Sequence, residues 1–228
     1  MKNDTNNKIC CFVQARLSST RLYSKVLKKI NNSTFLDLIY SKCKDKTYDL
    51  VFLIPSNEKE LALQFFLQKK KIRYFAGSYK NVLKRFYEAN QTLKYKTIVR
   101  LTADNIFLDR IFIKNNLRKY FKLSNENVLY STRKNFPKGI TMEIFSSKML
   151  EESFNKSINN YEKEHVTPYM YDNYMVVYAR NKFYKKFSNL NCSIDTKTEY
   201  NKIRNFAKSV DFLNLNTYNL VKKFYEFQ

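Results

Sequence analysis

Short apolar runs alternate with helical patterns along the first half of the chain. Residues 9–13 and 50–54 are continuous apolar runs between polar residues, which is typical of strands buried on both faces. Between them, apolar residues recur at helical spacing over residues 35–43, behind Ser33 and Thr34, which can cap a helix. The chain is therefore expected to begin with a strand, a helix and a second strand.

The same alternation continues to residue 102. A helical pattern from residue 61 ends in the lysines 69–71, which suit a helix C-terminus. A strand over 72–75, a helix that carries residues 82–87 and a strand over 97–102 follow. Strands that alternate with helices predict right-handed crossovers and a mostly parallel sheet, so the pattern indicates an α/β fold.

The second half has a more mixed pattern. We expect strands over residues 127–132, 141–145 and 192–194, and helices over 147–155, 161–172, 196–207 and 217–227. No linker rich in Gly, Pro or Ser divides the sequence, and no internal repeat is visible. The 228 residues are therefore expected to form a single domain.

Composition narrows the class of protein. Hydrophobic residues make up 44% of the chain and aromatic residues 16% of the chain, which excludes a disordered protein. No apolar run approaches the roughly 20 residues of a membrane helix, and the polar N-terminus lacks the apolar stretch of a secretory signal. The four cysteines form no metal-like C-x-x-C pair, so we expect reduced, buried thiols in a cytoplasmic protein without membrane insertion.

The formal charge of +22 has more than one interpretation. A basic surface attracts nucleic acid, anionic lipid or phosphorylated small molecules. Residues 118–124 and 182–187 interleave aromatic and basic side chains, as single-strand binders do. The lysines are spread along the whole chain, however, and core packing explains the aromatic residues better. We therefore do not expect nucleic acid as a partner.

The stretch after the first predicted strand is suited to phosphate. Arg16, Arg21 and Lys25 surround Ser19 and Thr20, and guanidinium forks and hydroxyls bind phosphate oxygens. The loop also offers backbone amides as donors. On composition alone, a solvated basic connection explains the stretch equally well.

Two aspartates follow later predicted strands. Asp104 comes after the strand over 97–102, and Asp195 ends the short strand over 192–194. Ligands of open α/β sheets bind at the carboxyl ends of strands, so both are candidate ligands of Mg²⁺. Each could instead be a helix cap, and Asp104 could be a turn residue.

Taken together, these segments resemble the cytidylyltransferases that activate acidic or amino sugars with CMP, nearest to the spore-coat polysaccharide biosynthesis and acylneuraminate branch. The family opening Q-A-R-x-G-S-x-R-L-P-x-K-x-L is matched by "QARLSSTRLYSKVL", its G-D-C-P by "ADNI" and its V-D-T-x-E-D-L by "SIDTKTEY". The segments "AGSYKNVLKRFYEA", "NFPKGITMEIFS" and "EHVTPYMY" correspond in the same order. The resemblance thus covers nearly the whole chain.

This resemblance implies a Rossmann-like three-layer α/β/α nucleotidyltransferase fold (GT-A-like), with a nucleotide-binding half near residues 1–110 and an acceptor-binding half near 111–228. It implies transfer of CMP from CTP to a sugar or sugar-acid acceptor, with Mg²⁺ as cofactor and pyrophosphate as product, for a surface glycan. It also implies a homodimer with contacts around residues 135–174.

The resemblance assigns roles to individual residues. The catalytic residues implied are Arg16, Lys25, Asp104 and Asp195, of which Asp104 and Asp195 would hold the metal. The nucleotide-binding residues implied are Gln14, Ala15, Arg16, Ser19, Thr20, Arg21, Lys25, Gly77, Ser78, Thr102 and Asp104. The acceptor-binding residues implied are Arg133, Gly139, Glu143, Glu164 and His165. His165 could instead be a hydrogen-bonded structural residue.

The sequence departs from the family pattern at several positions. Ser18, Ser24 and Ala103 stand where the family has Gly, Tyr23 and Ile106 where it has Pro, and Thr141 where it has an acidic residue. Glycine permits a positive φ and a close backbone approach to phosphate. The alternatives are therefore a catalytically inactive member that binds nucleic acid or a partner through its basic surface, or a nucleotidyltransferase that uses another nucleotide or a phosphorylated acceptor.

Overall fold

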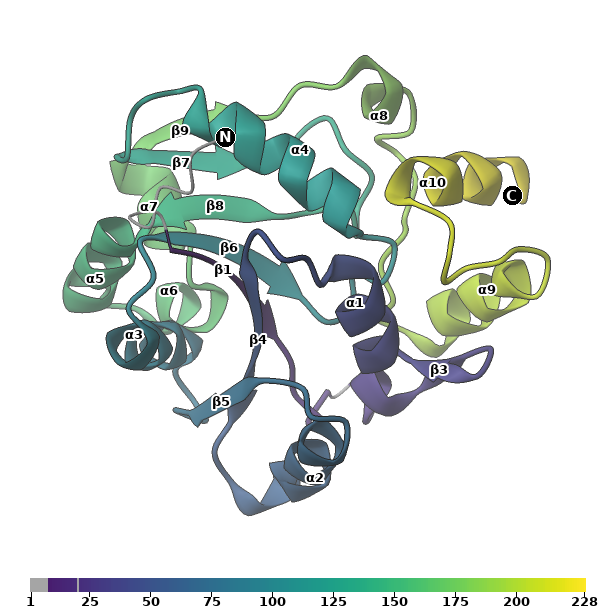
Figure 1. Cartoon of the computed structure of the whole chain (residues 1–228), viewed down its shortest axis with the longest axis horizontal. Helices are drawn as coiled ribbons and strands as arrows, with labels where there is room; N and C mark the ends of the chain where they lie inside the picture. The colour runs from purple at the N-terminus through teal and green to yellow at the C-terminus, as the bar shows by residue number, and fades with distance from the viewer. Residues whose placement is uncertain (1–7, 20) are drawn as a thin grey trace.

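The structure is a computed structural model, and it describes residues 8–19 and 21–228. Thr20, one of the predicted nucleotide-binding residues, lies outside the described residues. A seven-stranded sheet with the order β5-β4-β1-β6-β8-β7-β9 forms the centre of the molecule (Figure 1). Its strands are β1 (Ile9–Gln14), β4 (Asp49–Pro55), β5 (Tyr74–Gly77), β6 (Thr97–Thr102), β7 (Val128–Ser131), β8 (Glu143–Ser146) and β9 (Met175–Tyr178).

Most strand pairs of this sheet are parallel. β1 pairs in parallel with β4 and β6, β4 with β5, and β7 with β9. Only β8 runs against its neighbours β6 and β7. The prediction of a mostly parallel α/β sheet is thus confirmed, and the sheet contains strands from both halves of the chain.

Helices cover both faces of the sheet and complete three layers. They are α1 (Phe35–Cys43), α2 (Leu61–Lys69), α3 (Val82–Leu93), α4 (Arg110–Phe121), α5 (Ser147–Lys156), α6 (Asn160–His165), α7 (Pro168–Asn173), α8 (Lys182–Lys186), α9 (Lys197–Ala207) and α10 (Thr217–Glu226). The small elements are the 3₁₀ turns η1 (Lys25–Leu27) and η2 (Glu58–Glu60) and the strands β2 (Lys29–Ile30) and β3 (Ser33–Thr34). No described helix has the length and apolar character that crossing a membrane requires.

The continuous apolar runs explain why both faces are covered. Cys10 and Phe12 of β1 pack into the core beneath α3, α5 and α7, whereas Cys11 and Val13 pack into the core beneath α1, α4, α9 and α10. Figure 1 shows α3 and α5 on one side of the sheet and α1 and α4 on the other. Because successive strand residues face opposite sides, a strand between two helical layers must be apolar throughout.

The predicted helix over residues 161–172 is two helices. α6 ends at His165, Val166 has a φ of 70°, and α7 begins at Pro168. Proline restricts the residue before it and donates no backbone hydrogen bond, so a helix cannot continue through Thr167 and Pro168 unbroken. β5 and β8 also begin two residues later than their predicted strands over 72–75 and 141–145.

The predicted strand over residues 192–194 is wrong. Among the described residues, the only β-type pairing of this region is the single bridge between Lys138 and Asn191. The backbone of Lys138 donates to Leu190 and accepts from Cys192, at 3.0 and 2.7 Å. Residues 190–194 therefore form an extended crossing over residues 137–140 rather than a sheet strand.

Gly139 makes this crossing possible. Its φ is +86°, and a Cβ there would lie 2.4 Å from the backbone nitrogen of Ser193 and 2.5 Å from the carbonyl carbon of Cys192. Only glycine permits both this backbone conformation and this close approach. Gly139 thus lets the chain before Asp195 reach the loops at the end of the sheet.

Apart from the small elements η1, η2, β2 and β3, three elements were not predicted from the sequence. α4 has apolar residues at helical spacing, but they lie among cationic and amide residues, and only its C-terminal end overlaps the basic aromatic stretch over residues 118–124. The four residues of β9 and the five of α8 are too short to show a period.

We predict that Gly139→Ala lowers the free energy of unfolding by about 2–4 kcal/mol, because the methyl group overlaps backbone atoms at a strained φ. Urea denaturation measures the change. Ser188→Ala, at an exposed position of the same region, is the matched control and should leave the midpoint unchanged. Equal stability of Gly139→Ala and the control would contradict the close crossing.

Candidate active site

The candidate site lies where several strand ends meet at one edge of the sheet. Gln14 ends β1 and pairs with Thr102, which ends β6. Arg100 of β6 pairs with Glu143, the first residue of the antiparallel strand β8. One strand reversal therefore brings the start of β8 to the edge where the parallel strands end, and ligands of α/β sheets bind at that edge.

The opening loop is fixed by a buried carboxylate. Glu60 of η2 accepts hydrogen bonds from the backbone nitrogens of Leu17 at 2.8 Å and Ser18 at 3.4 Å. The nitrogen of Ser24 donates to the carbonyl of Leu17 at 3.0 Å, which closes the loop. Nothing in the sequence pattern identifies Glu60, since it lies far from every motif.

One of the family's glycine positions shows why glycine is favoured there. Ser24 has a φ of 51° in the left-handed region, immediately before η1. Ser18 and Ala103 have no positive φ. The substitutions at Ser18 and Ala103 therefore carry no backbone strain, whereas Ser24 holds a conformation that glycine would adopt more easily.

Lys25 joins the two predicted aspartates. Its Nζ lies 2.6 Å from Oδ2 of Asp104 and 3.1 Å from Oδ1 of Asp195, and it also donates to the carbonyl of Ile194. The Lys25 side chain is 14% exposed, and the carboxylates are 20% and 14% exposed. Two carboxylates remote in the sequence thus lie within reach of one cation.

Asp195 faces further cations. Arg21 lies 3.3 Å from its Oδ1, and Lys138 lies 3.4 Å from its Oδ2. Partial burial by itself raises the pKa of the Asp195 carboxyl, but Lys25, Arg21 and Lys138 together lower the pKa below its ordinary value. The carboxylate is therefore ionised at neutral pH and sits among cations that are suited to a polyanion.

Neither aspartate is a helix cap. Thr196 is the N-cap of α9 and forms a capping box with Glu199, whose carboxylate accepts from the backbone nitrogens of Asp195 and Thr196. Asp109, not Asp104, caps α4. The hydroxyl of Thr102 donates to Oδ1 of Asp104 at 2.5 Å, which orients that side chain. Both carboxylates are thus free to face the loop.

The donor set fits a divalent cation that shares its ligands with phosphate. Among the residues that the structure describes, no group of three or more His, Cys, Asp or Glu side chains could hold a metal. Asp104 and Asp195 supply two carboxylates that already meet at one positive charge. Mg²⁺ typically binds one or two carboxylates and completes its shell with phosphate oxygens and water.

A cavity of about 160 Å³ surrounds this cluster. Its lining contains Gln14, Ala15, Arg16, Arg21, Lys25, Val26, Thr102, Ala103, Asp104 and Asp195. The structure thus brings together most of the residues that the sequence assigned to the nucleotide and metal. Arg16 also lies 3.9 Å from Glu164 of α6, with both side chains half-exposed.

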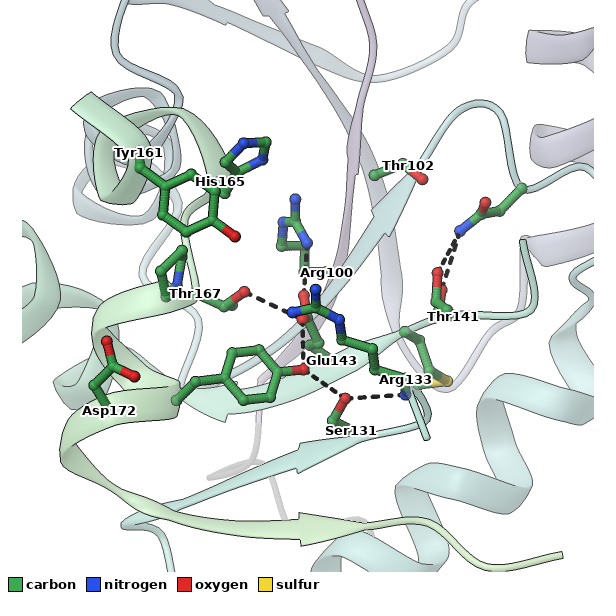
Figure 2. Close-up of a pocket in the computed structure, with 14 residues that line it drawn as sticks. Arg100, Thr102, Ser131, Arg133, Thr141, Glu143, Tyr161, His165, Thr167 and Asp172 are labelled. Carbon is green, nitrogen blue, oxygen red and sulfur yellow. Dashed lines mark hydrogen bonds and ion pairs between the residues drawn. The ribbon is translucent and has the colours of Figure 1, made fainter. Parts of the chain in front are cut away.

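A second cavity, of about 410 Å³, adjoins the first and shares Thr102 with it. Figure 2 shows the residues that line this cavity, with Tyr161 and His165 together on one side of the view and Arg133 and Glu143 near its middle. The Arg133 guanidinium lies 5.6 Å from the centre of the Tyr171 ring. Of the predicted acceptor residues, Arg133, Glu143 and His165 line this cavity.

A hydrogen-bond network forms the floor of the second cavity. Arg100 donates to Glu143 at 2.6 Å and to the side-chain oxygen of Gln14 at 3.3 Å. The other carboxylate oxygen of Glu143 accepts from Thr167 at 3.1 Å and Tyr171 at 2.8 Å. Burial first, and the charge of Glu143 next, raise the pKa of the Tyr171 hydroxyl, so it remains a donor. Arg100 therefore connects the two cavities.

Other predicted residues lie outside both cavities. Gly77 ends β5, two strands away from β1, and the carbonyl of Ser78 accepts from Arg85. Gly139 packs against residues 192–193, as described above. Ser19 and Glu164 line neither cavity. The binding roles assigned to these residues stay predictions.

The sequence analysis missed Arg100, Thr167 and Tyr171. Arg100 carried one usable signal, a charge inside the otherwise apolar strand "TIVRLT", since buried charges are paired. Thr167 and Tyr171 lie in the family-matched segment "EHVTPYMY", but no pattern singled them out, because their contact with Glu143 depends on the break between α6 and α7.

Comparison with known sequences identifies relatives along nearly the whole chain. The family model for cytidylyltransferases matches residues 10–224. A protein of Methanocaldococcus jannaschii, named only as uncharacterised, is 30% identical over 213 residues, which cover 91% of this chain and 86% of that protein. The spore coat polysaccharide biosynthesis protein SpsF of Bacillus subtilis is 28% identical over 208 residues, covering 87% and 85%.

Comparison with solved structures bears on the fold. A cytidylyltransferase from Leptospira borgpetersenii superimposes with a TM-score of 0.88 at 22% identity, covering 96% of this chain and 94% of that one. A CMP:2-keto-3-deoxy-manno-octonic acid synthetase, solved with CTP, superimposes with a TM-score of 0.62 at 12% identity, covering 90% and 100%. These likenesses confirm the predicted Rossmann-like three-layer nucleotidyltransferase architecture.

We predict that Glu143→Gln lowers the free energy of unfolding by about 2–3 kcal/mol, because it leaves the Arg100 side chain, which is only 15% exposed, without its counter-charge. Chemical denaturation monitored by circular dichroism measures the loss. Glu152→Gln removes an exposed carboxylate that also contacts a tyrosine and a cation, and it is the control. If both substitutions shift the midpoint equally, the Arg100–Glu143 pair does not stabilise the fold.

Proposed function

Since the chain belongs to the cytidylyltransferase family, we propose that it transfers CMP from CTP to a sugar or sugar-acid acceptor and releases pyrophosphate. The observation that carries this proposal is the meeting of Asp104, Asp195 and Lys25 at the mouth of the opening loop. Catalysis of nucleotidyl transfer depends mainly on neutralising and positioning the phosphates. This cluster supplies a cation that can neutralise phosphate charge and two carboxylates that can hold a metal ion.

The nucleotide would occupy the cavity around the opening loop. Lys25, Arg21 and Lys138 provide positive charge next to Asp195, and Arg16 provides a further guanidinium at the rim. Guanidinium groups bind phosphate oxygens in a bidentate manner, and an ammonium acts as a point charge. These side chains would hold the triphosphate and stabilise the charge that develops on the departing pyrophosphate.

Asp104 and Asp195 would hold Mg²⁺. Bound there, the ion would neutralise phosphate charge and orient the reacting group. Thr102 keeps the Asp104 carboxylate in place through its hydroxyl, and the capping box of α9 leaves the Asp195 carboxylate free. Lys25 would exchange one or both of its carboxylate contacts for phosphate oxygens.

The acceptor would occupy the second cavity. Its volume of about 410 Å³ suits a single sugar unit, and it opens beside Thr102 at the nucleotide cavity. An acceptor hydroxyl there would attack the α-phosphorus and release its proton to solvent. The bond between the α-phosphorus and the α–β bridging oxygen would break, and pyrophosphate would leave with that oxygen. Arg133, exposed and next to Tyr171, could bind an anionic group of the acceptor.

The names of two similar proteins support a sugar acceptor. SpsF is named for spore coat polysaccharide biosynthesis, and one structural neighbour is named as a synthetase of a CMP-linked sugar acid. We accordingly propose a role in the synthesis of a surface glycan. A homodimer with contacts around residues 135–174 and a cytoplasmic location stay predictions.

We predict that Asp104→Asn and Asp195→Asn each lower turnover by about 100-fold or more, because each removes half of the carboxylate pair. Pyrophosphate release from CTP and Mg²⁺, measured across a panel of acidic sugars and polyols, tests this. Asp49→Asn, an exposed carboxylate at the opposite end of β4, is the control and should retain activity. Either site variant retaining most of the activity would contradict its metal role.

The base preference is tested separately. CTP with Mg²⁺ should raise the melting temperature of the protein more than UTP, ATP or GTP does, because ligands stabilise the state that binds them. Lys25→Ala should reduce this CTP-dependent shift by more than it lowers the melting temperature of the free protein. If another nucleotide raises the melting temperature more than CTP does, that nucleotide is the substrate in place of CTP, and the proposed nucleotidyl transfer still stands.

A further inference from the structure

A third cavity lies along β9, away from the candidate active site. Its volume is about 1040 Å³, and it shares no lining residue with the nucleotide or acceptor cavity. We name it the β9 groove and define it by residues 176–182 along its length and by Lys119, Lys134 and Lys185 on its walls. The proposed transfer reaction uses none of these residues.

The groove follows the open edge of the central sheet. Within the described part of the chain, β9 pairs only with β7, and Figure 1 shows it at the end of the sheet opposite β5. Residues 176–178 of β9 line the groove consecutively, and Ala179 and Arg180 continue the lining beyond the end of the strand. Alternate strand residues face opposite sides of a sheet, so consecutive residues can share a groove only along the strand's edge. An open edge presents backbone N–H and C=O groups to which another strand can be added.

The charge of the groove has one sign. Its lining contains the cations Lys119, Lys134, Arg180, Lys182 and Lys185 and no aspartate or glutamate. These cations come from α4, the loop after β7, and the segment from β9 into α8. Such a surface favours an anionic occupant through charge complementarity.

The two basic aromatic stretches noted in the sequence meet at this groove, but none of their aromatic rings belongs to its lining. Tyr120 and Tyr184 are buried. Phe183 stacks on Tyr218, with ring centres 3.7 Å apart. The Lys134 ammonium lies over the Tyr178 ring, 4.3 Å from the ring centre. Single-strand binders stack bases on free aromatic faces, so this groove offers charge and a strand edge rather than a stacking platform.

We propose that the β9 groove binds an acidic, extended segment of a partner protein, which adds to β9 as a further strand. Main-chain hydrogen bonds along the edge would fix the segment, and its carboxylates would face the surrounding lysines and Arg180. The interaction would weaken as salt is added, because the cations are exposed to solvent. Both active-site cavities would stay open while the partner is bound.

The test measures binding of the full chain to a fluorescein-labelled peptide of alternating Glu and Val, seven residues long, by fluorescence anisotropy. The paired substitution Lys182→Glu with Lys185→Glu should raise the Kd about tenfold or more. Lys69→Glu with Lys148→Glu changes the net charge equally at exposed helix positions away from the groove and should stay within about twofold of the unsubstituted protein.

Two further probes separate strand addition from charge alone. The same peptide with alternate backbone nitrogens methylated keeps its charge but cannot pair with β9, and it should bind about tenfold more weakly or worse. A twelve-residue thymidine oligonucleotide should lose no more affinity with the groove substitutions than with the control pair, because both pairs change the net charge equally. The proposal is wrong if the methylated peptide binds equally, if both paired substitutions weaken binding alike, or if the oligonucleotide is the ligand that the groove variant loses.

Discussion

The contact of Lys25 with both Asp104 and Asp195 is the interaction on which the arrangement of the site depends. Two ionised carboxylates repel each other unless a cation lies between them, and these three side chains are largely withdrawn from water. Their meeting requires that β1 and β6 be neighbours and that residues 190–194 cross Gly139 closely. The fold thus brings three remote parts of the chain to one point of charge.

The sequence allowed the architecture and the charged cluster to be predicted because both depend on local patterns. Strands buried on both faces are mostly apolar, and the cations and Asp104 fall just after such runs, whereas Asp195 follows an extended crossing that is not a strand. The floor of the acceptor cavity could not be predicted in this way. Arg100, Thr167 and Tyr171 meet at Glu143 only because β8 is antiparallel and the helical region breaks at Val166. Tertiary geometry of this kind leaves no periodic signal in the sequence.

The cations that give the chain its high positive charge lie in two different surroundings. Lys25, Arg21 and Lys138 face Asp195 and belong to the site where the proposed reaction takes place. The lysines of the β9 groove face no carboxylate along its lining, and there we propose an acidic partner. The net charge alone cannot distinguish cations of an active site from cations of a docking surface, because the effect of each cation depends on the groups around it.

The central claim is that residues 104 and 195 share one metal ion with a bound triphosphate. Crystals grown with CTP and Mn²⁺ in place of Mg²⁺ allow the ion to be located by its anomalous scattering. The account predicts a single peak roughly 2.1–2.2 Å from a carboxylate oxygen of each aspartate, with Nζ of Lys25 moved to a phosphate oxygen. A manganese peak that contacts neither aspartate, or a triphosphate bound away from the opening loop, would contradict the account.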